Sequence, residues 1–298
     1  MRNGIGSIYC NTKHSVSIDT TFILLRTLIF LRTMNLKTPI TYWDGKQLLL
    51  PKLLPIIPVH EVYTEAFCGG AALYFAKEPA KNEIINDLNG EVTNFYTQLK
   101  TNFNKLFNLI DASLFSRREY DFAIIIYNYP TYFSNLQRAW AFYYLSKTSF
   151  AAKINGTFGY DKQEKNCCVK KFRNAKLNFT EELVKRLENT QIENTDALKI
   201  IESRDSEFCF HFIDPPYFNS DCGHYKGYNE IDFKHLLNIC EKLKGKFILT
   251  MYPCEIINEY IRRNNWNIIE LERTISASKV NRRKQTELIV TNYVLGFN

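Results

Sequence analysis

Residues 59–87 read VHEVYTEAFCGGAALYFAKEPAKNEIIND, and the order of elements in this stretch predicts the fold. A short apolar-rich run leads to Phe67-Cys68-Gly69-Gly70, a helical pattern follows, and a second short strand, Glu83–Asn86, ends at Asp87. Strand, glycine turn, helix, strand and acidic residue within about 30 residues is the plan of a nucleotide-binding βαβ unit, in which glycines admit a ligand to the backbone and a carboxylate binds ribose hydroxyls. We therefore expect an α/β fold, with an ordinary tight turn as the alternative explanation of the glycine pair.

Strands and helices alternate again late in the chain. A strongly apolar strand over 207–213 precedes a helix that we expect Asp232 to cap. Segments 266–271 and 287–294 are predicted to close the sheet as an antiparallel pair. The region near 90–185 is helical, aromatic and basic in patches, and it is large enough for an inserted domain. We therefore predict a mixed sheet with a terminal antiparallel hairpin and an inserted, mainly helical domain.

The composition is that of a globular protein. The 298 residues are 45% hydrophobic and 23% charged, and no run of about 18 uncharged apolar residues occurs, so we predict neither disorder nor a membrane-spanning helix. The net charge of +7 is compatible with a nucleic-acid partner without being evidence for one. The eight cysteines lack CxxC spacing, which favours reduced thiols in a cytoplasmic protein. We expect no metal, although a site could be drawn from Cys209, His211, Cys222 and His224.

The strand over 207–213 ends at Asp214-Pro215-Pro216-Tyr217, and ligands of open α/β sheets bind outside the carboxyl ends of strands. Two prolines fix φ and donate no backbone hydrogen bond, so the loop is stiff and rich in acceptors. The Asp214 carboxylate and the Pro215 carbonyl can each accept one N–H of an exocyclic amine, and Tyr217 can stack on the base that carries it. Acceptors on both hydrogens direct the nitrogen lone pair at an electrophile and stabilise the positive charge that forms. We therefore predict Asp214, Pro215, Pro216 and Tyr217 as catalytic residues, with a simple strand-ending turn as the alternative.

Several motifs stand in the order found in one known family. They are Thr41-Tyr42-Trp43-Asp44-Gly45-Lys46, Glu65-Ala66-Phe67-Cys68-Gly69-Gly70, Asn86-Asp87-Leu88-Asn89, Thr195-Asp196-Ala197, the tetrapeptide at Asp214, and Arg273-Thr274-Ile275-Ser276 with Thr286-Glu287-Leu288. From Thr38 to about Tyr293 the sequence resembles the Dam-like DNA adenine methyltransferases. The resemblance implies a Rossmann-like enzyme that methylates the exocyclic amino group of adenine with S-adenosylmethionine.

Carried over position by position, the resemblance also implies site residues and domain bounds. It assigns cofactor contacts to Tyr42, Lys46, Asp87 and Asp214, the shape of the cofactor pocket to Glu65, Phe67, Gly69 and Gly70, and a place near the cofactor's adenine to Asp196. The catalytic domain is expected over 34–100 and 186–298, and the target-recognition domain over 101–185.

The chemistry implies double-stranded DNA as the partner. An adenine inside a duplex cannot enter a buried pocket, so we expect the base to be flipped out. Tyr144–Tyr160 resembles the family's DNA-contacting loop, and a basic turn near 279–284 suits phosphates, with a solvated turn as its alternative. The residues expected to bind DNA are Lys147, Lys153, Asn155, Lys279, Arg282, Arg283 and Lys284. A cognate restriction endonuclease is a further candidate partner, and no obligate protein partner is evident.

Other functions stay open at this point. The same two hydrogen-bond acceptors could bind the amino group of cytosine, so cytosine amino-group methylation is one alternative. A catalytically silent DNA-binding relative that keeps the fold is a second. A dinucleotide-dependent oxidoreductase is a third, suggested only by the βαβ unit. Pro253-Cys254 resembles the nucleophile dipeptide of cytosine carbon-5 methyltransferases. Residues 1–33 differ in character from the rest, and we expect them to be an upstream extension with Met34 as the natural start; an amphipathic N-terminal helix is the alternative.

Overall fold

The computed structural model describes residues 36–42, 45–154, 156–160, 167–218, 227–275 and 283–295, without the side chains of 273–275 and 283. Several of the expectations above concern residues outside these ranges. They are those on residues 1–33 and Met34, on Trp43 and Asp44, on Cys222 and His224, and on Asn155, Lys279, Arg282 and the side chain of Arg283. Within the described ranges, no helix is long and apolar enough to cross a membrane.

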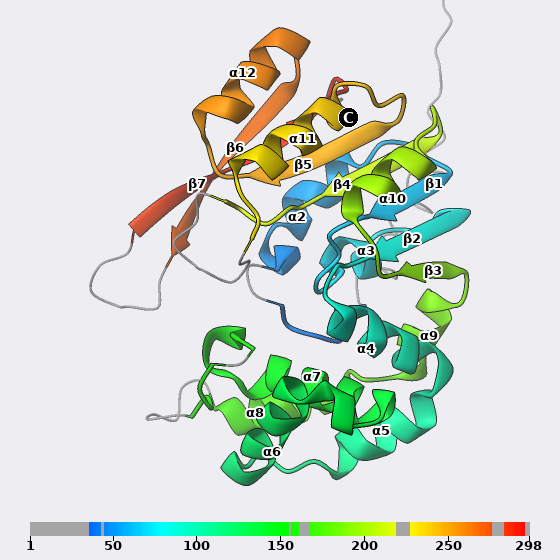
Figure 1. Ribbon diagram of the computed structural model, residues 1–298, viewed down its shortest axis with the longest axis vertical. Helices are drawn as coiled ribbons and strands as arrows, with labels where there is room; N and C mark the ends of the chain where they lie inside the picture. Colours follow the sequence, from blue (N-terminus) through cyan, green and yellow to red (C-terminus); the bar gives the residue numbers. More distant parts are fainter. Residues whose placement is uncertain are drawn as a thin grey trace, which may run out of the picture.

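The described strands form one seven-stranded sheet in the order β3-β2-β1-β4-β5-β7-β6 (Figure 1). Five strands are parallel: β1 (Val62–Glu65), β2 (Asn82–Asn86), β3 (Thr190–Glu193), β4 (Cys209–Ile213) and β5 (Lys246–Met251). The last two, β6 (Asn267–Ile275) and β7 (Arg283–Thr291), form an antiparallel hairpin, and β7 pairs with β5. The predicted mixed α/β sheet with a terminal antiparallel hairpin is confirmed, and the hairpin strands reach closer to their connecting turn than predicted.

The helices between β2 and β3 form the predicted helical insertion. Figure 1 shows them gathered below the sheet. They are α4 (Gly90–Thr101), α5 (Phe103–Ala112), α6 (Arg117–Asn128), η3 (Pro130–Tyr132), α7 (Asn135–Thr148), η4 (Phe150–Ala152), α8 (Cys168–Leu177) and α9 (Glu181–Leu187). The other helical segments are η1 (Lys46–Leu48), α2 (Leu50–Leu53), η2 (Leu54–Ile56), α3 (Ala72–Ala76), α10 (Ala197–Arg204), α11 (Glu230–Cys240) and α12 (Glu255–Asn264).

The start of α11 corrects one prediction. Asn229, not Asp232, caps this helix: its side chain accepts hydrogen bonds from the backbone N–H groups of Ile231 (2.7 Å) and Asp232 (3.3 Å). Asp232 instead reaches back to the N–H of Asn229 at 2.9 Å, so the two side chains form a capping box. Asn and Asp are equally good caps, and the sequence alone did not distinguish a cap at 229 from one three residues later.

Alternate residues of the strands bury opposite faces of the sheet. Phe210 and Phe212 of β4 belong to a buried cluster with residues of α3 and of the helical insertion, whereas Ile213 belongs to a second cluster with residues of α10, α11 and α12. Phe142, on α7, belongs to the same buried cluster as Phe210, so the helical insertion shares its core with one face of the sheet. This shared core fixes the position of the insertion relative to the strands.

The order of the strands also identifies where a ligand would bind. From β1 the chain moves outward through β2 and β3, and it then returns to the other side of β1 with β4 and β5. The sheet therefore reverses its winding between β1 and β4, and ligands of doubly wound sheets bind at the carboxyl ends of the strands at such a point. β1 ends at Glu65, beside the glycine turn, and β4 ends next to Asp214.

Candidate active site

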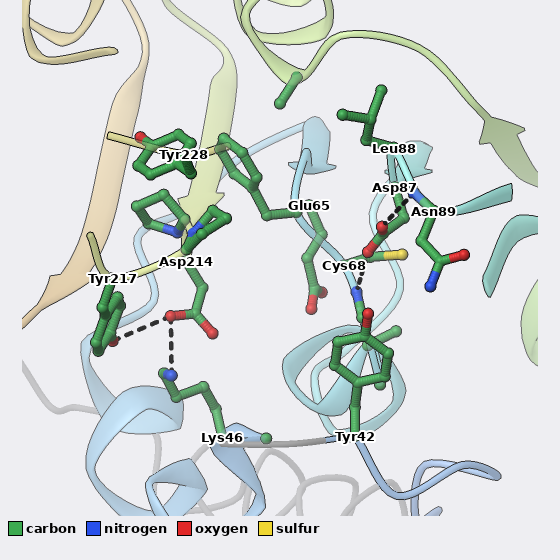
Figure 2. A pocket seen from close by; sticks show the side chains of 18 of the residues that line it. Tyr42, Lys46, Glu65, Cys68, Asp87, Leu88, Asn89, Asp214, Tyr217 and Tyr228 are labelled. Atoms are coloured by element: carbon green, nitrogen blue, oxygen red, sulfur yellow. Dashed lines mark hydrogen bonds and ion pairs between the residues drawn. The ribbon is translucent and has the colours of Figure 1, made fainter. Parts of the chain in front are cut away.

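A cavity of about 1050 Å³ lies at this reversal point. Its wall combines the loops after β1, β2, β3 and β4 with η1 and with the segment after α7. All the predicted catalytic and cofactor residues line it, and they lie far apart in sequence: Tyr42, Lys46, Glu65, Phe67, Gly69, Gly70, Asp87, Asp196, Asp214, Pro215, Pro216 and Tyr217. Figure 2 shows many of these side chains around the cavity.

The glycine turn after β1 leaves no room for a side chain. Gly69 has φ of +45°, and a Cβ atom there would lie 2.7 Å from Cδ1 of the Tyr42 ring. Its N–H donates to Oδ2 of Asp87 at 2.8 Å, which binds the turn to the end of β2. Glycine is therefore required at position 69 for both backbone conformation and close packing under Tyr42.

Asp87 lies shortly before α4, and its carboxylate accepts hydrogen bonds from two backbone N–H groups. Besides the bond from Gly69, its Oδ1 accepts the N–H of Asn89 at 2.8 Å. Burial raises the pKa of Asp87, and the two backbone hydrogen bonds oppose that rise. The carboxylate is thus fixed in orientation at the edge of the cavity, where it can accept hydrogen bonds from a ligand's hydroxyl groups.

Asn86 is a structural residue of the site that the sequence did not single out. Its Nδ2 donates to the carbonyls of Ala66 (2.8 Å) and Thr195 (3.1 Å), and its Oδ1 accepts the N–H of Thr195 (3.0 Å). One buried amide thereby holds together the ends of β1, β2 and β3. Asp196, which follows Thr195 in the chain, lines the cavity. It caps α10 by accepting a 2.9 Å hydrogen bond from the N–H of Leu198 at its Oδ1.

Asp214 is held through one of its two oxygens. Lys46 Nζ (2.8 Å), Thr250 Oγ1 (2.6 Å) and Tyr217 Oη (3.1 Å) all contact Oδ1. Among the described residues, no hydrogen bond reaches Oδ2, and 19% of the side-chain surface is exposed (Figure 2). Burial raises the pKa of Asp214, and the charge of Lys46 opposes that rise. The carboxylate is therefore fixed in direction while one oxygen is left for a ligand.

Two further residues support this arrangement from neighbouring strands. Thr250 lies near the end of β5, and Glu287 lies within β7, where it is fully buried. Glu287 Oε1 accepts the Tyr217 hydroxyl at 2.9 Å and lies 3.4 Å from Lys46 Nζ. Neither was assigned a role from sequence, although Glu287 stands in the motif Thr286-Glu287-Leu288 quoted above.

Glu65 is a second carboxyl group of the cavity in a different environment. It is 2% exposed, and its Oε2 accepts the Tyr63 hydroxyl (2.8 Å) and the N–H of Tyr74 (3.1 Å). Burial raises its pKa to about 8 despite these hydrogen bonds, and the charge of Asp214 raises it further. Glu65 is therefore protonated at neutral pH, and a cation placed in the cavity would favour its ionised form.

The structure describes the side chains of three of the residues predicted to bind DNA, and each lies in a different environment. Lys153 is exposed and lines the cavity just after η4. Lys147, at the end of α7, donates to Thr41 Oγ1 at 3.0 Å; no carboxylate among the described residues contacts it, and burial lowers its pKa to about 7. Lys284 lies on β7 in the terminal hairpin. Its side chain is exposed, and its Nζ lies 2.8 Å from Oε2 of Glu272 on β6.

The cysteine and histidine candidates do not form a site within the described residues. Cys209 and His211 are both buried in β4, with Sγ and Nδ1 3.8 Å apart, and His211 Nδ1 lies 2.7 Å from Thr64 Oγ1. Burial raises the pKa of the Cys254 thiol, which is the opposite of what activates a nucleophilic cysteine. No cluster of three or more His, Cys, Asp or Glu side chains in these ranges is arranged to hold a metal ion.

The fold and this cavity are those of an enzyme class, and comparison with known proteins identifies it. The sequence profile of the family described as D12 class N6 adenine-specific DNA methyltransferase matches residues 42–276. The match covers most of the chain, so the protein belongs to this family, and the resemblance seen in the motifs is confirmed. The protein is accordingly an adenine-specific DNA methyltransferase rather than an oxidoreductase.

The chain is also similar to individual known proteins. The chain is 29% identical over 285 residues to the Type II methyltransferase M1.LlaDCHI of Lactococcus lactis subsp. cremoris, which is 87% of this chain and 96% of that protein. Among solved structures, the putative methyltransferase yhhF from Escherichia coli aligns with 86% of this chain and 89% of its own, with a TM-score of 0.35 and 12% sequence identity.

Proposed function

We propose that the protein transfers a methyl group from S-adenosylmethionine to the exocyclic amino group of an adenine that has been flipped out of duplex DNA. The observation that carries this proposal is the fixation of Asp214: three donors hold Oδ1, and Oδ2 is left within the cavity. A carboxylate in this state can accept one N–H of an amine without having to break a contact of its own.

The residues of the cavity suit the cofactor. Its volume of about 1050 Å³ is large enough for a nucleoside and a base together. The glycine turn allows close approach to the backbone, and Asp87 is placed to bind ribose hydroxyls. Asp214 lines the cavity as a carboxylate that a cationic ligand would favour, and such a ligand would also favour the ionised form of Glu65. When bound, S-adenosylmethionine supplies a methyl group that is electrophilic because it is attached to a sulfonium centre.

The residues of the Asp-Pro-Pro-Tyr loop act on the amine. Asp214 Oδ2 accepts one N–H and the Pro215 carbonyl accepts the other, which directs the nitrogen lone pair at the methyl group. As the new N–C bond forms and the bond between the methyl group and sulfur breaks, with sulfur leaving as a neutral thioether, the nitrogen would become positive, and the negative charge of Asp214 would stabilise it. The surplus proton then leaves the nitrogen for Asp214 or for water.

The DNA would approach the open side of the cavity. We assign Lys153 and Lys147 of the helical insertion to contacts with DNA phosphates. Lys153 lines the cavity, and Lys147 lies beside Thr41. The Lactococcus relative is called a Type II methyltransferase, and we propose by analogy that this protein also works alongside a cognate restriction endonuclease, in the cytoplasm.

Substitution of Asp214 tests the proposal. Asp214→Ala and Asp214→Asn should lower single-turnover methyl transfer by on the order of 10²–10³-fold or more, since both remove the charge that stabilises the developing cation. Cofactor affinity, measured by calorimetry, should fall less. Nucleoside analysis of duplex substrates reports the product: N6-methyladenine from the wild type supports the assignment, and N4-methylcytosine would replace it.

Asp111→Asn is the matched control. Asp111 is 67% exposed on α5, away from the cavity, and its substitution should leave the rate unchanged. Wild-type activity in Asp214→Ala would refute the mechanism.

A further inference from the structure

We propose that Glu287 is a positioning residue for methyl transfer: it balances the charge of Lys46, so that the Asp214 carboxylate keeps its negative charge available to the amine. This inference rests on the function proposed above. Glu287 does not line the cavity; it acts through Lys46 and Tyr217, which do.

The contacts connect Glu287 to both of these residues. Its Oε1 lies 3.4 Å from Lys46 Nζ, and the same Nζ lies 2.8 Å from Asp214 Oδ1. Lys46 is 4% exposed and Glu287 is fully buried, so these charges are not separated by bulk water. One lysine is thus shared by two carboxylates that arrive from β4 and β7.

The charges of this cluster explain why a second carboxylate is useful. Lys46 paired with Asp214 alone would form a neutral pair, and the lysine would oppose a cationic cofactor and the positive charge that develops on the amine. With Glu287 present, two carboxylates share the charge of Lys46, so less of that positive charge opposes a cation that forms beside Asp214.

Tyr217 links the two carboxylates geometrically. Its hydroxyl lies 3.1 Å from Asp214 Oδ1 and 2.9 Å from Glu287 Oε1, and its ring packs edge-to-face on Tyr252 with centroids 4.5 Å apart. A hydroxyl has one proton to donate, so the two carboxylates compete for it, and any change of charge on Glu287 alters the hydrogen bond to Asp214.

The charge of Glu287 also acts on the titration of Asp214. Glu287 raises the pKa of Asp214, whereas Lys46 lowers it. The titratable groups that face this cluster from the surrounding elements are Lys46, Glu65, Tyr217 and Tyr252. Loss of the Glu287 charge removes its upward influence on the pKa of Asp214, so Asp214 then ionises at a lower pH.

The test is the pH dependence of single-turnover methyl transfer by Glu287→Gln. We expect the plateau rate to fall about 10- to 100-fold, because the negative charge that offsets Lys46 is lost, and the acid limb of the profile to move to lower pH. KM for DNA should stay within about threefold of the wild type, since Glu287 touches no substrate. A role in folding alone would lower activity without moving the acid limb.

Glu287→Asp and a neighbouring glutamate provide the controls. Glu287→Asp keeps the charge but withdraws it from Lys46, so it should lie between wild type and Glu287→Gln, and it carries the test if Glu287→Gln does not fold. Glu272→Gln, on β6 in the exposed pair with Lys284, should leave the profile unchanged. An acid limb that stays in place in both Glu287 variants overturns the inference, whereas a wild type that forms no N6-methyladenine overturns the proposed function instead.

Discussion

At the scale of single residues, two carboxyl groups of one cavity are prepared for different tasks. Burial raises the pKa of Asp214, and the charge of Lys46, 2.8 Å away, opposes that rise. Glu65 is buried with a hydroxyl and a backbone N–H as its hydrogen-bond partners, so its neutral form is favoured, with a pKa of about 8. Pairs of acidic groups whose surroundings separate their titration are typical of sites where one carboxylate must stay charged.

The neutral state of Glu65 predicts a pH-dependent stability. Its pKa is about 8 in the folded protein and near 4.5 when unfolded, so between these values the folded state holds a proton that the unfolded state releases. Stability therefore falls as pH rises through this window. Glu65→Gln removes the effect and should gain stability relative to wild type between pH 5 and pH 7, by at most about 3 kcal/mol, in urea unfolding.

Glu61→Gln is the control for that measurement. Glu61 lies just before the other end of β1, 52% exposed and paired with Lys81. Its effect on the free energy of unfolding should be the same at both pH values. A difference between Glu65→Gln and wild type that does not change with pH would show that Glu65 is already ionised in the folded protein.

The residues that sequence could identify are those that carry a local pattern. Gly69 stands in a glycine turn and Asp214 in a rigid tetrapeptide after an apolar strand, and both line the cavity. Thr250 has no such pattern around it, and the motifs that contain Asn86 and Glu287 did not indicate what these two side chains do. All three contact the site because separate strands meet at one edge of the sheet, and this pairing is not visible in the order of residues.

At the scale of elements, the sequence predicted which segments are strands and which are helices. Where each strand begins and ends depended on the strand that it pairs with. β7 begins at Arg283, several residues before the predicted strand, because it pairs with β6 throughout this polar stretch. Similarly, the contacts between elements depend on long side chains. Arg186 of α9 donates to both carboxylate oxygens of Glu83 on β2 and to the carbonyl of Tyr74 on α3 (2.6 Å).

Arg186→Met should therefore loosen the attachment of α9 to the sheet. The guanidinium is 7% exposed and stacks on Tyr74, 3.8 Å from the ring centroid, so its loss leaves buried Glu83 with Lys77 as its remaining charged partner. We expect about 3 kcal/mol of destabilisation in urea unfolding.

Lys185→Met, on the same helix, is the comparison. Lys185 is 66% exposed and pairs with Glu182 at 2.7 Å, and its loss should cost about 0.5 kcal/mol or less. Equal effects of the two substitutions would mean that the buried network contributes no more than a surface ion pair.

At the scale of the whole molecule, the helical insertion and the sheet enclose the cavity together. Phe95 of α4 lies 6.4 Å from Phe142 and 6.2 Å from Tyr143 of α7, measured between ring centroids, and 6.4 Å from Phe179. The sequence predicted an inserted helical region rich in aromatic residues, but not that these rings pack on one another in a buried cluster that also contains Phe210 of β4. Such a shared core depends on the tertiary arrangement, which periodicity within one helix does not contain.

The proposed contact of Lys147 with a DNA phosphate predicts DNA binding that depends on pH. With a pKa of about 7, Lys147 is charged below neutral pH and increasingly neutral above it, so affinity for a duplex should weaken from pH 6 to pH 8. Lys147→Arg stays charged and should flatten this dependence, whereas Lys147→Ala should weaken binding and reduce the salt slope by about 0.9. Lys81 precedes β2, at the amino ends of the parallel strands, and its side chain is 71% exposed. Lys81→Ala should change neither the affinity for DNA nor the salt slope. Fluorescence anisotropy at several salt concentrations makes the measurement, and parallel pH curves for wild type and Lys147→Arg would remove Lys147 from the DNA interface.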